Sequence, residues 1–373
     1  MSQEESKKKV KYNKPLLSIL DRYIIKKFLG TYVFSITLII SIAVIFDINE
    51  KLDKFLRNNA SLKAIVFDYY LNFIPYYTNL FSALFVFIAV IFFTSTMANN
   101  SEIIAMLSNG MSFKRMMKPY MISAAVIALV SFLLSSFVIP PANITRIAFQ
   151  NRFVSNKKVD YVARIQVQIE PGVIAFIESY DDNNKSGRNF SLDKFKNKEL
   201  VSRLTAREIE YTGGYHWIIK DYSIREFNGR KETITTGASL DSTLNMMPQN
   251  FLISINDFET MTTPQLYKYI NQQKDRGIGN IKGFEIEYHK RFASIASAFI
   301  LTIIGAALSS RKIKGGMGLN IGIGLLLSVS YILFMTVTSS FAVSGLVSPL
   351  IAAWIPNIIF SFIATFVYKR APN

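Results

Sequence analysis

The residues able to do chemistry are few, and their spacing fits no catalytic motif. The chain has no cysteine and only two histidines, His216 and His289. This excludes zinc–thiolate sites, iron–sulfur clusters and cysteine nucleophiles, and two isolated histidines make a poor metal site. Neither a G-x-x-x-x-G-K-[ST] phosphate loop nor a G-x-S-x-G elbow occurs. The sequence therefore predicts no catalytic residue, no metal site, no cofactor and no ATPase activity of its own.

One short segment suits docking to a partner. Asn99–Ser101 offer helix-capping oxygens, Glu102 falls in the positive first turn, and Gly110 can end the helix in a left-handed conformation. The apolar residues that share one helical face are Ile103, Met106 and Leu107. Such a helix either docks in a groove on another protein or rests on the lipid surface, and the pattern alone leaves both interpretations open.

The composition indicates the class of protein to which these residues belong. Half of the 373 residues are hydrophobic, only 18% are charged, and the formal net charge is still +16. Soluble domains carry about a quarter charged residues. A nucleic-acid-binding protein would be rich in charge as well as basic. The remaining class is a membrane protein whose few charges are mostly positive.

Six stretches can cross a bilayer core of about 30 Å, which takes about 20 residues of helix. The first is longer than a signal-peptide core and no A-x-A site follows it, so we interpret it as a retained anchor. The predicted spans are Phe28–Phe46, about Ile65–Met97 with its firmly apolar part at Phe81–Phe93, Pro119–Ile139, Phe292–Ser310, Met317–Val343 and Pro349–Tyr368.

The basic residues gather in four segments that these spans place on one side of the membrane. They are the N-terminal tail, two loops and the C-terminal tail, with net charges of +5, +2, +3 and +2. The other side receives residues 47–72, with no net charge, and an uncharged loop. Because Lys and Arg mark the cytoplasmic side, both termini are predicted to be cytoplasmic.

Residues 140–291 lie outside in this topology and have the pattern of a β domain. Alternation over Val162–Ile169 is typical of a half-buried strand, and turn signals such as Pro171-Gly172 separate further short strands. Thr263–Lys274 is predicted to be helical. The predicted fold is a membrane α-helical domain of six transmembrane helices with an inserted all-β, jellyroll-like domain.

Several segments carry a family resemblance. They are Leu20–Ile24 before the first span, Ser101–Gly110 between spans two and three, Pro140 and Asn143 after span three, and Ala352–Asn357 at the last span. With the order of three spans, β domain and three spans, the chain resembles the LptF/LptG (YjgP/YjgQ) permease family of the lipopolysaccharide exporter. The first and last segments look more like the LptG branch.

The resemblance implies a permease of the bacterial inner membrane that is not an enzyme. It would pair with a second LptF/LptG-type permease, and an LptB-like cytoplasmic ATPase dimer would drive lipopolysaccharide through the periplasmic β domain to an LptC/LptA-like bridge. It implies no nucleic-acid partner, and a homodimer stays open. The domains would be a tail at 1–27, spans one to three at 28–139 with a coupling helix at about 101–110, the β domain at 140–291, and spans four to six with the C-terminus at 292–373.

The resemblance also implies site residues. The ATPase-coupling residues would be Glu102, Ile103, Met106, Leu107 and Gly110, with Glu102 as the polar contact. The candidates for the anionic lipid headgroup would be Lys51, Lys54 and Arg146, although solvated loop charges are an equal alternative. LptG relatives tend to have a lysine near the position of Asp47 here. Spans one and five would line the lipid cavity, and Gly318-x-x-x-Gly322 would serve packing within the chain or a dimer seam.

Three other functions can be compared with the sequence. An ion-coupled transporter normally needs ionisable groups inside the bilayer, and the apolar cores have none. A lipid-modifying enzyme would need a catalytic constellation, which the sequence lacks. A membrane-anchored sensor or assembly scaffold with a partner-binding β domain is compatible with the sequence and is the main alternative to an exporter permease.

Overall fold

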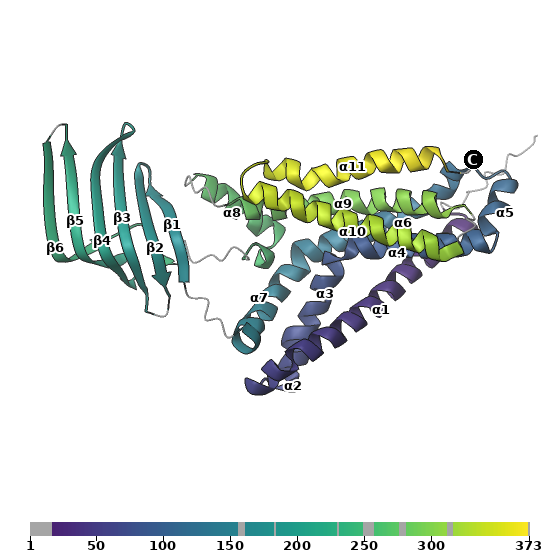
Figure 1. The fold of residues 1–373 in the computed structure, drawn as a ribbon, viewed down its shortest axis with the longest axis horizontal. Helices are drawn as coiled ribbons and strands as arrows, with labels where there is room; N and C mark the ends of the chain where they lie inside the picture. Colours follow the sequence, from purple (N-terminus) through teal and green to yellow (C-terminus); the bar gives the residue numbers. More distant parts are fainter. Residues whose placement is uncertain are drawn as a thin grey trace, which may run out of the picture.

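The computed structural model describes residues 17–155, 161–182, 184–229, 231–248, 257–275, 281–311 and 316–371. Within these ranges, a bundle of apolar helices carries a separate β domain, as predicted, and six helices are long and apolar enough to span a membrane. The β domain lies at one end of the bundle and α5 (Glu102–Ser108) at the other (Figure 1). We name these the β-domain end and the α5 end.

The long helices are continuous over more residues than their apolar cores. They are α1 (Ile19–Arg57), α4 (Ser82–Asn99), α6 (Phe113–Leu133), α9 (Lys282–Ser309), α10 (Gly316–Val343) and α11 (Pro349–Lys369). The shorter helices are α2 (Leu62–Ala64), η1 (Ile65–Tyr70), α3 (Leu71–Leu80), η2 (Leu134–Val138), α7 (Ile139–Gln150), η3 (Asn151–Ser155), η5 (Asp257–Thr260) and α8 (Thr263–Asp275).

Irregular helix geometry gathers toward the β-domain end. The second predicted span is broken at Phe81 (φ −97°, ψ 14°), so that α4 alone forms its membrane-spanning part. The third span continues through the π-helix η2 into α7, whose first turn contains Pro140 and Pro141. Proline has no N–H for the carbonyl one turn earlier, which accounts for a π-helical turn directly before it. The residues from 140 to 155 are therefore helical, and the β domain begins later.

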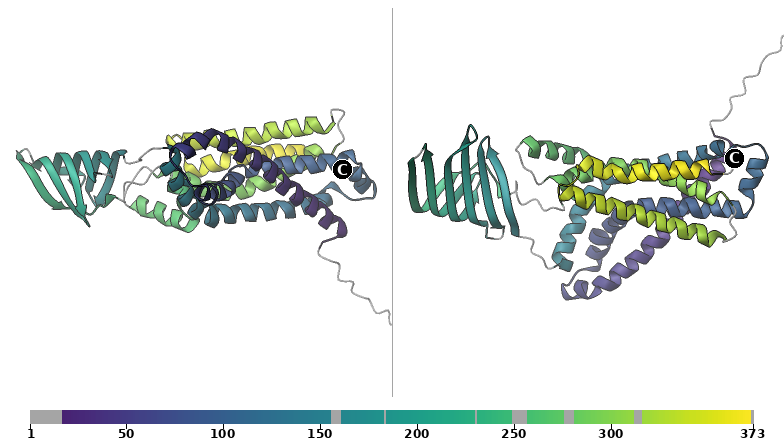
Figure 2. Two further views of the ribbon diagram at one scale, coloured as in Figure 1. Left: turned by 90° about the horizontal axis from the view of Figure 1, so that it is seen from below. Right: turned by 45° about the horizontal axis from the view of Figure 1, so that its top comes forward.

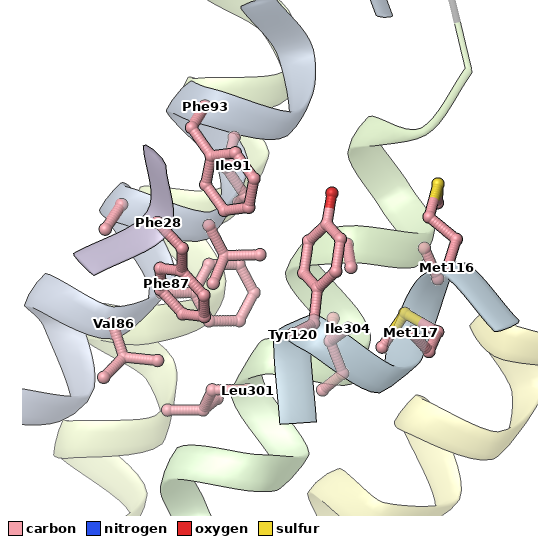
Figure 3. Packing of buried hydrophobic residues seen from close by; sticks show 14 of the residues in the cluster. Phe28, Val86, Phe87, Ile91, Phe93, Met116, Met117, Tyr120, Leu301 and Ile304 are labelled. Atoms are coloured by element: carbon pink, nitrogen blue, oxygen red, sulfur yellow. The ribbon is translucent and has the colours of Figure 1, made fainter. Parts of the chain in front are cut away.

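The core of the bundle lies between α1, α4, α6, α9 and α11. Phe93 stacks on both Phe28 and Tyr120, with ring centroids 5.2 and 5.1 Å away, and Phe28 and Tyr120 are 6.2 Å from each other, so the three rings form a triangular cluster (Figure 3). The Tyr120 hydroxyl lies 3.1 Å from Oγ1 of Thr94, which satisfies the polar end of this buried ring. Aromatic packing thus attaches the first part of α1 to α4 and α6.

The β domain is one antiparallel sheet whose described strands follow each other in sequence order. They are β1 (Tyr161–Glu170), β2 (Val173–Asp181), β3 (Ser186–Lys196), β4 (Glu199–Gly213), β5 (His216–Asn228) and β6 (Lys231–Thr243). One face is apolar: Ile177 lies opposite Phe190, and Phe190 opposite Ala206. Trp217 is fully buried and donates Nε1–H to the carbonyl of Met246 at 3.1 Å. This up-and-down order differs from the crossing connections of a jelly roll (Figures 1 and 2).

Replacing Gly305 by leucine tests the contact between α9 and α4. A Cβ at Gly305 would lie 2.9 Å from Cγ1 and 3.2 Å from Cβ of Val90. Overpacking of this kind costs about 1–3 kcal/mol, so Gly305→Leu should lower the apparent melting temperature of the detergent-purified protein. Gly30→Leu is the matched control, because a Cβ at Gly30 meets nothing within 4 Å. Equal melting of the two variants would contradict the close contact.

Candidate functional site

The start of α5 is held to α1 by the carboxylate of Glu102. The hydroxyl of Tyr23 donates to Oε2 at 2.8 Å, and Nζ of Lys27 lies 3.9 Å from Oε1. Ser101 precedes the helix with a left-handed φ of +61° and makes no side-chain cap, in contrast to the capping that its residue type suggests. Gly110 follows the helix with φ of +81°, the left-handed conformation expected for it. Glu102 therefore fixes where α5 begins relative to α1.

The predicted apolar face of α5 lies toward the bundle. Ile103 is fully buried, and Met106 and Leu107 are half-buried against the same core. The outward face contains Ile104, which is 52% exposed. The other outward residues are Ala105, Ser108 and Asn109. Ile103 thus seats the helix on the bundle, while Ile104, which the i, i+3, i+4 pattern passes over, is the apolar side chain left open to a partner.

An ion pair between an exposed arginine and a buried aspartate links the helices beside α5. Arg115 at the start of α6 donates two hydrogen bonds to the carboxylate of Asp21 in α1, at 2.6 and 2.7 Å. The Asp21 side chain is only 3% exposed and also caps the first turn of α1 with Ser18. A bidentate arginine–carboxylate contact fixes the relative orientation of the two side chains as well as their distance. The frame that carries α5 is therefore rigid on this side.

At the β-domain end, the two candidate lysines of α1 have different surroundings. Nζ of Lys51 pairs with Asp47 and donates to the Tyr69 hydroxyl, and both members of the ion pair are 12% exposed. The Tyr70 hydroxyl donates to the same carboxylate at 3.0 Å. Lys54 is exposed. Asp47, the departure from the family pattern, is thus the counter-charge of Lys51, and of these two lysines Lys54 faces outward.

Arg146 is buried in a polar cluster at the same end. Its Nε donates to Asn143 at 2.9 Å, its guanidinium lies 4.2 Å from the ring centre of Tyr76, and one nitrogen is 3.4 Å from Glu259. The Tyr76 hydroxyl donates to Glu259 at 2.9 Å. Burial raises the pKa of Glu259, and the hydrogen bond from Tyr76 and the positive charge of Arg146 oppose that rise. The cluster joins α3, α7 and η5.

A cavity of about 360 Å³ adjoins this cluster within the bundle. Arg291 lines it and donates to Glu287 at 3.1 Å and to Thr263 at 3.0 Å. Hydroxyl groups also line it, among them those of Ser82, Ser131, Ser297 and Tyr331. Sequence patterns missed this cavity because its wall is assembled from residues of several helices far apart in the chain.

The spanning helices with the fewest buried residues are α1 and α10. Of the most hydrophobic 18 residues, 17% are buried in α1 and 22% in α10, against 33% in α11, 44% in the span that contains α6, 56% in α9 and 61% in α4. A Cβ at Gly318 or Gly322 would meet nothing within 4 Å, whereas Gly324 packs against Ile91 and Phe87. Large exposed side chains on this flank include Phe34, Leu38, Phe46, Leu326, Leu333 and Phe341. Packing within the chain therefore uses Gly324 and leaves the Gly318–Gly322 face open.

The histidines lie apart from these sites. His216 is exposed on β5, and His289 packs edge-on against Tyr288 in α9. Throughout the part of the chain that the structure describes, no group of three or more His, Asp or Glu residues is placed to hold a metal ion.

Substituting Glu259 by glutamine tests its burial. Because the folded-state pKa lies above the ordinary 4.5, the folded chain holds this proton more tightly than the unfolded chain, and ionisation costs stability as pH rises through that range. Gln cannot ionise, so the melting temperature of Glu259→Gln relative to the parent should be higher at pH 7 than at pH 4.5. Thermal unfolding at both pH values measures this difference, and a decrease toward pH 7 would contradict the assignment.

Comparison with known proteins agrees with this architecture. Residues 22–370 match the family described as Lipopolysaccharide export system permease LptF/LptG. No match was found among curated proteins. The matched region includes both sets of spanning helices and the β domain between them. The chain therefore belongs to the LptF/LptG family, the permeases of lipopolysaccharide export.

Proposed function

We propose that the chain is a non-catalytic, inner-membrane permease subunit of an ATP-driven exporter of lipopolysaccharide. The observation that supports this beyond family membership is the uncovered apolar flank of α1 and α10. Acyl chains leaving one membrane for another need a surface of this kind within the bilayer. A membrane-anchored sensor or scaffold would also expose apolar surface to lipid, so capture of lipopolysaccharide on this flank is the observation that separates the two functions.

The orientation follows from charge. Basic residues gather at the α5 end, which by the positive-inside rule is the cytoplasmic end. They include Arg22, Lys26, Lys27, Lys114, Lys118, Arg311, Lys369 and Arg370. The β domain then lies in the periplasm, where it would pass the lipid to an LptC/LptA-like bridge protein.

The open flank also suits a second permease. Helices associate in lipid through close packing of small residues, and the Gly318–Gly322 face of α10 is free of contacts within this chain. A second LptF/LptG-type chain there would enclose a lipid path between the two proteins. Leu20–Ile24 and Ala352–Asn357 favour the LptG-like half for this chain.

The three basic residues proposed to bind the lipid headgroup differ in how accessible their charges are. Lys54 is exposed near the outer end of α1 and is our first candidate for a phosphate of the lipid. Lys51 and Arg146 have carboxylate partners, Asp47 and Glu259. They would bind a headgroup only by exchanging those partners for its phosphates.

Helix α5 is the proposed contact to the ATPase dimer. Its outward face presents Ile104. Glu102 and Ile103 hold the helix in position, and Met106, Leu107 and Gly110 shape its second half. Coupling then passes through α1 and α6, which the Asp21–Arg115 pair joins beside the helix.

Reversing the charge of Glu102 tests the coupling role. Glu102→Lys loses the Tyr23 bond and places an ammonium beside Lys27, so α5 should leave its seat and co-purified ATPase should fall about tenfold, or about 1.4 kcal/mol. Ile104→Ser should have a similar effect while the Glu102 contacts stay intact. Glu50→Lys, exposed at the opposite end of α1, carries the same charge change as a control. Unchanged ATPase association and hydrolysis in both α5 variants would rule out this role.

Photocrosslinking tests the lipid path. Probes replacing Leu38 and Phe46 in α1 or Leu326 and Leu333 in α10 should capture lipopolysaccharide in membranes, because these side chains lie on the open flank. Phe362 in α11 is 73% exposed and lies off that flank, so a probe there serves as the control. Absence of capture from all four flank positions would favour the sensor or scaffold function instead.

A further inference from the structure

The helices at the β-domain end include a separately packed unit, which we name the aromatic lobe. It comprises residues 47–80 and 139–155, and its helices α3 and α7 diverge from α9, α10 and α11 (Figures 1 and 2). Its buried residues form a hydrophobic cluster separate from the bundle core. The ring of Phe149 lies 5.7 Å from that of Phe55 and 5.3 Å from that of Tyr69. Asn58 also donates to the carbonyl of Phe153 at 2.7 Å, so the lobe is packed as one body.

The polar cavity of about 360 Å³ lies between this lobe and the rest of the bundle. The lobe contributes Tyr76, Asn79 and Asn143 to its wall. Residues of α9 and α10, among them Ser297 and Tyr331, complete the wall. Access to the cavity therefore depends on how closely the two bodies approach each other.

The links between the lobe and the bundle lie at the same cavity. Helix α3 meets α4 at the break at Phe81, and α7 meets α6 through the π-helix η2. Leu80, Ser82 and Ser135, which belong to these links, line the cavity. Residues at the ends of elements absorb the backbone rotation of hinges, and π-helical turns are frequent at functional sites.

The third link, α1, is continuous but is built to bend. Side-chain hydroxyl groups in its spanning part bond back to carbonyls one turn earlier, a contact that favours helix bending. They are those of Thr31, Ser35, Thr37 and Ser41. All three links are thus compatible with rotation of the lobe as one body.

Helix η5 is anchored on the bundle side of the cavity. Arg291 of α9 donates to the carbonyl of Phe258 at 3.3 Å. The rings of Phe258 and Phe284 lie 5.9 Å apart, edge to face. A contact from the lobe to η5 is therefore a contact across the cavity to α9.

Glu259 of η5 receives such contacts from both α3 and α7. Tyr76 donates to its carboxylate at 2.9 Å, and a guanidinium nitrogen of Arg146 lies 3.4 Å from it. Asn143 donates to its backbone carbonyl at 3.2 Å. These bonds form only while the lobe lies against η5.

We propose that the aromatic lobe is a gate over the polar cavity and that Glu259 is the clasp that holds it closed. Opening rotates α3 and α7 away from α9 at the links around Phe81 and η2, and it separates Glu259 from Tyr76 and Arg146. The gate requires only the packing described here, so it stands or falls independently of lipopolysaccharide export.

Thiol modification tests the gate, because the chain has no cysteine of its own. Ser297→Cys places a thiol in the cavity at a position that is 5% exposed. Its rate of reaction with N-ethylmaleimide, a neutral reagent, in the full-length, detergent-purified chain follows the open fraction. Adding Tyr76→Phe should raise this rate about tenfold, the size of one hydrogen bond to a charged group. Adding Glu259→Ala should raise it further, because the Arg146 contact is lost as well.

Three controls separate gate opening from other effects. Glu287→Gln removes a carboxylate that lines the same cavity but pairs within α9, with Arg291, so the rate at position 297 should stay as in the parent. Lys63→Cys is exposed on the lobe and should react equally fast in every background. Val154→Cys lies in the buried core of the lobe and should stay protected if the lobe moves as one body.

Equal rates at position 297 in the parent, Tyr76→Phe and Glu259→Ala backgrounds would overturn the proposal. A matching rise at position 154 would overturn it too, because the lobe would then unfold instead of rotating. So would an equal rise with Glu287→Gln, which would assign the effect to charge in the cavity. If Glu259→Ala does not fold, Tyr76→Phe decides the question, since it removes only a hydroxyl group.

Discussion

Helix α9 can be approached closely from several sides because three consecutive small residues, Gly305, Ala306 and Ala307, are all buried. Lipid removes the hydrophobic driving force between helices, so close packing of this kind decides which helices associate. The positions around α9 are taken by α4, α6 and α11, and the aromatic stack at Phe28 adds only the first part of α1. The rest of α1 and one side of α10 remain on the flank, uncovered by this chain. The surface assigned to lipid and partner is thus a consequence of how α9 is packed.

The basic residues have different surroundings at the two ends of the bundle. At the β-domain end, Lys51 and Arg146 each have a carboxylate partner within the same chain, and these contacts join α1 to η1 and α7 to η5. At the α5 end, the acidic residues Asp21 and Glu102 are used to hold helices together. Other basic residues there, such as Arg22, Lys26 and Lys114, are exposed. Net charge alone does not separate these two situations, because it counts buried and exposed cations equally.

Local patterns were sufficient for the apolar cores of the spans, although not for the break at Phe81 in the second. They were also sufficient for β1, α8 and the left-handed Gly110, because each depends on neighbours in sequence. They were insufficient where contacts join distant segments. Arg146 meets Glu259 across 113 residues, and Tyr23 meets Glu102 across 79. Periodicity found the apolar face of α5 but not its direction, because an amphipathic helix can turn that face toward its own bundle or toward a partner. The order of the strands in the sheet could not be predicted either. Alternation of apolar and polar residues shows which side chains share a face of a strand, but not which strands lie next to each other.

The order of the sheet has a consequence for how the protein is made. Every described strand pairs with the one before it in the chain, from β1–β2 through β5–β6. Each strand therefore finds its partner as a hairpin as soon as both have been synthesised, and no strand has to wait for a distant segment. Folding of this kind has low contact order and exposes unpaired edges only briefly. A domain inserted between two sets of membrane helices can thus fold during synthesis, before the last three helices exist.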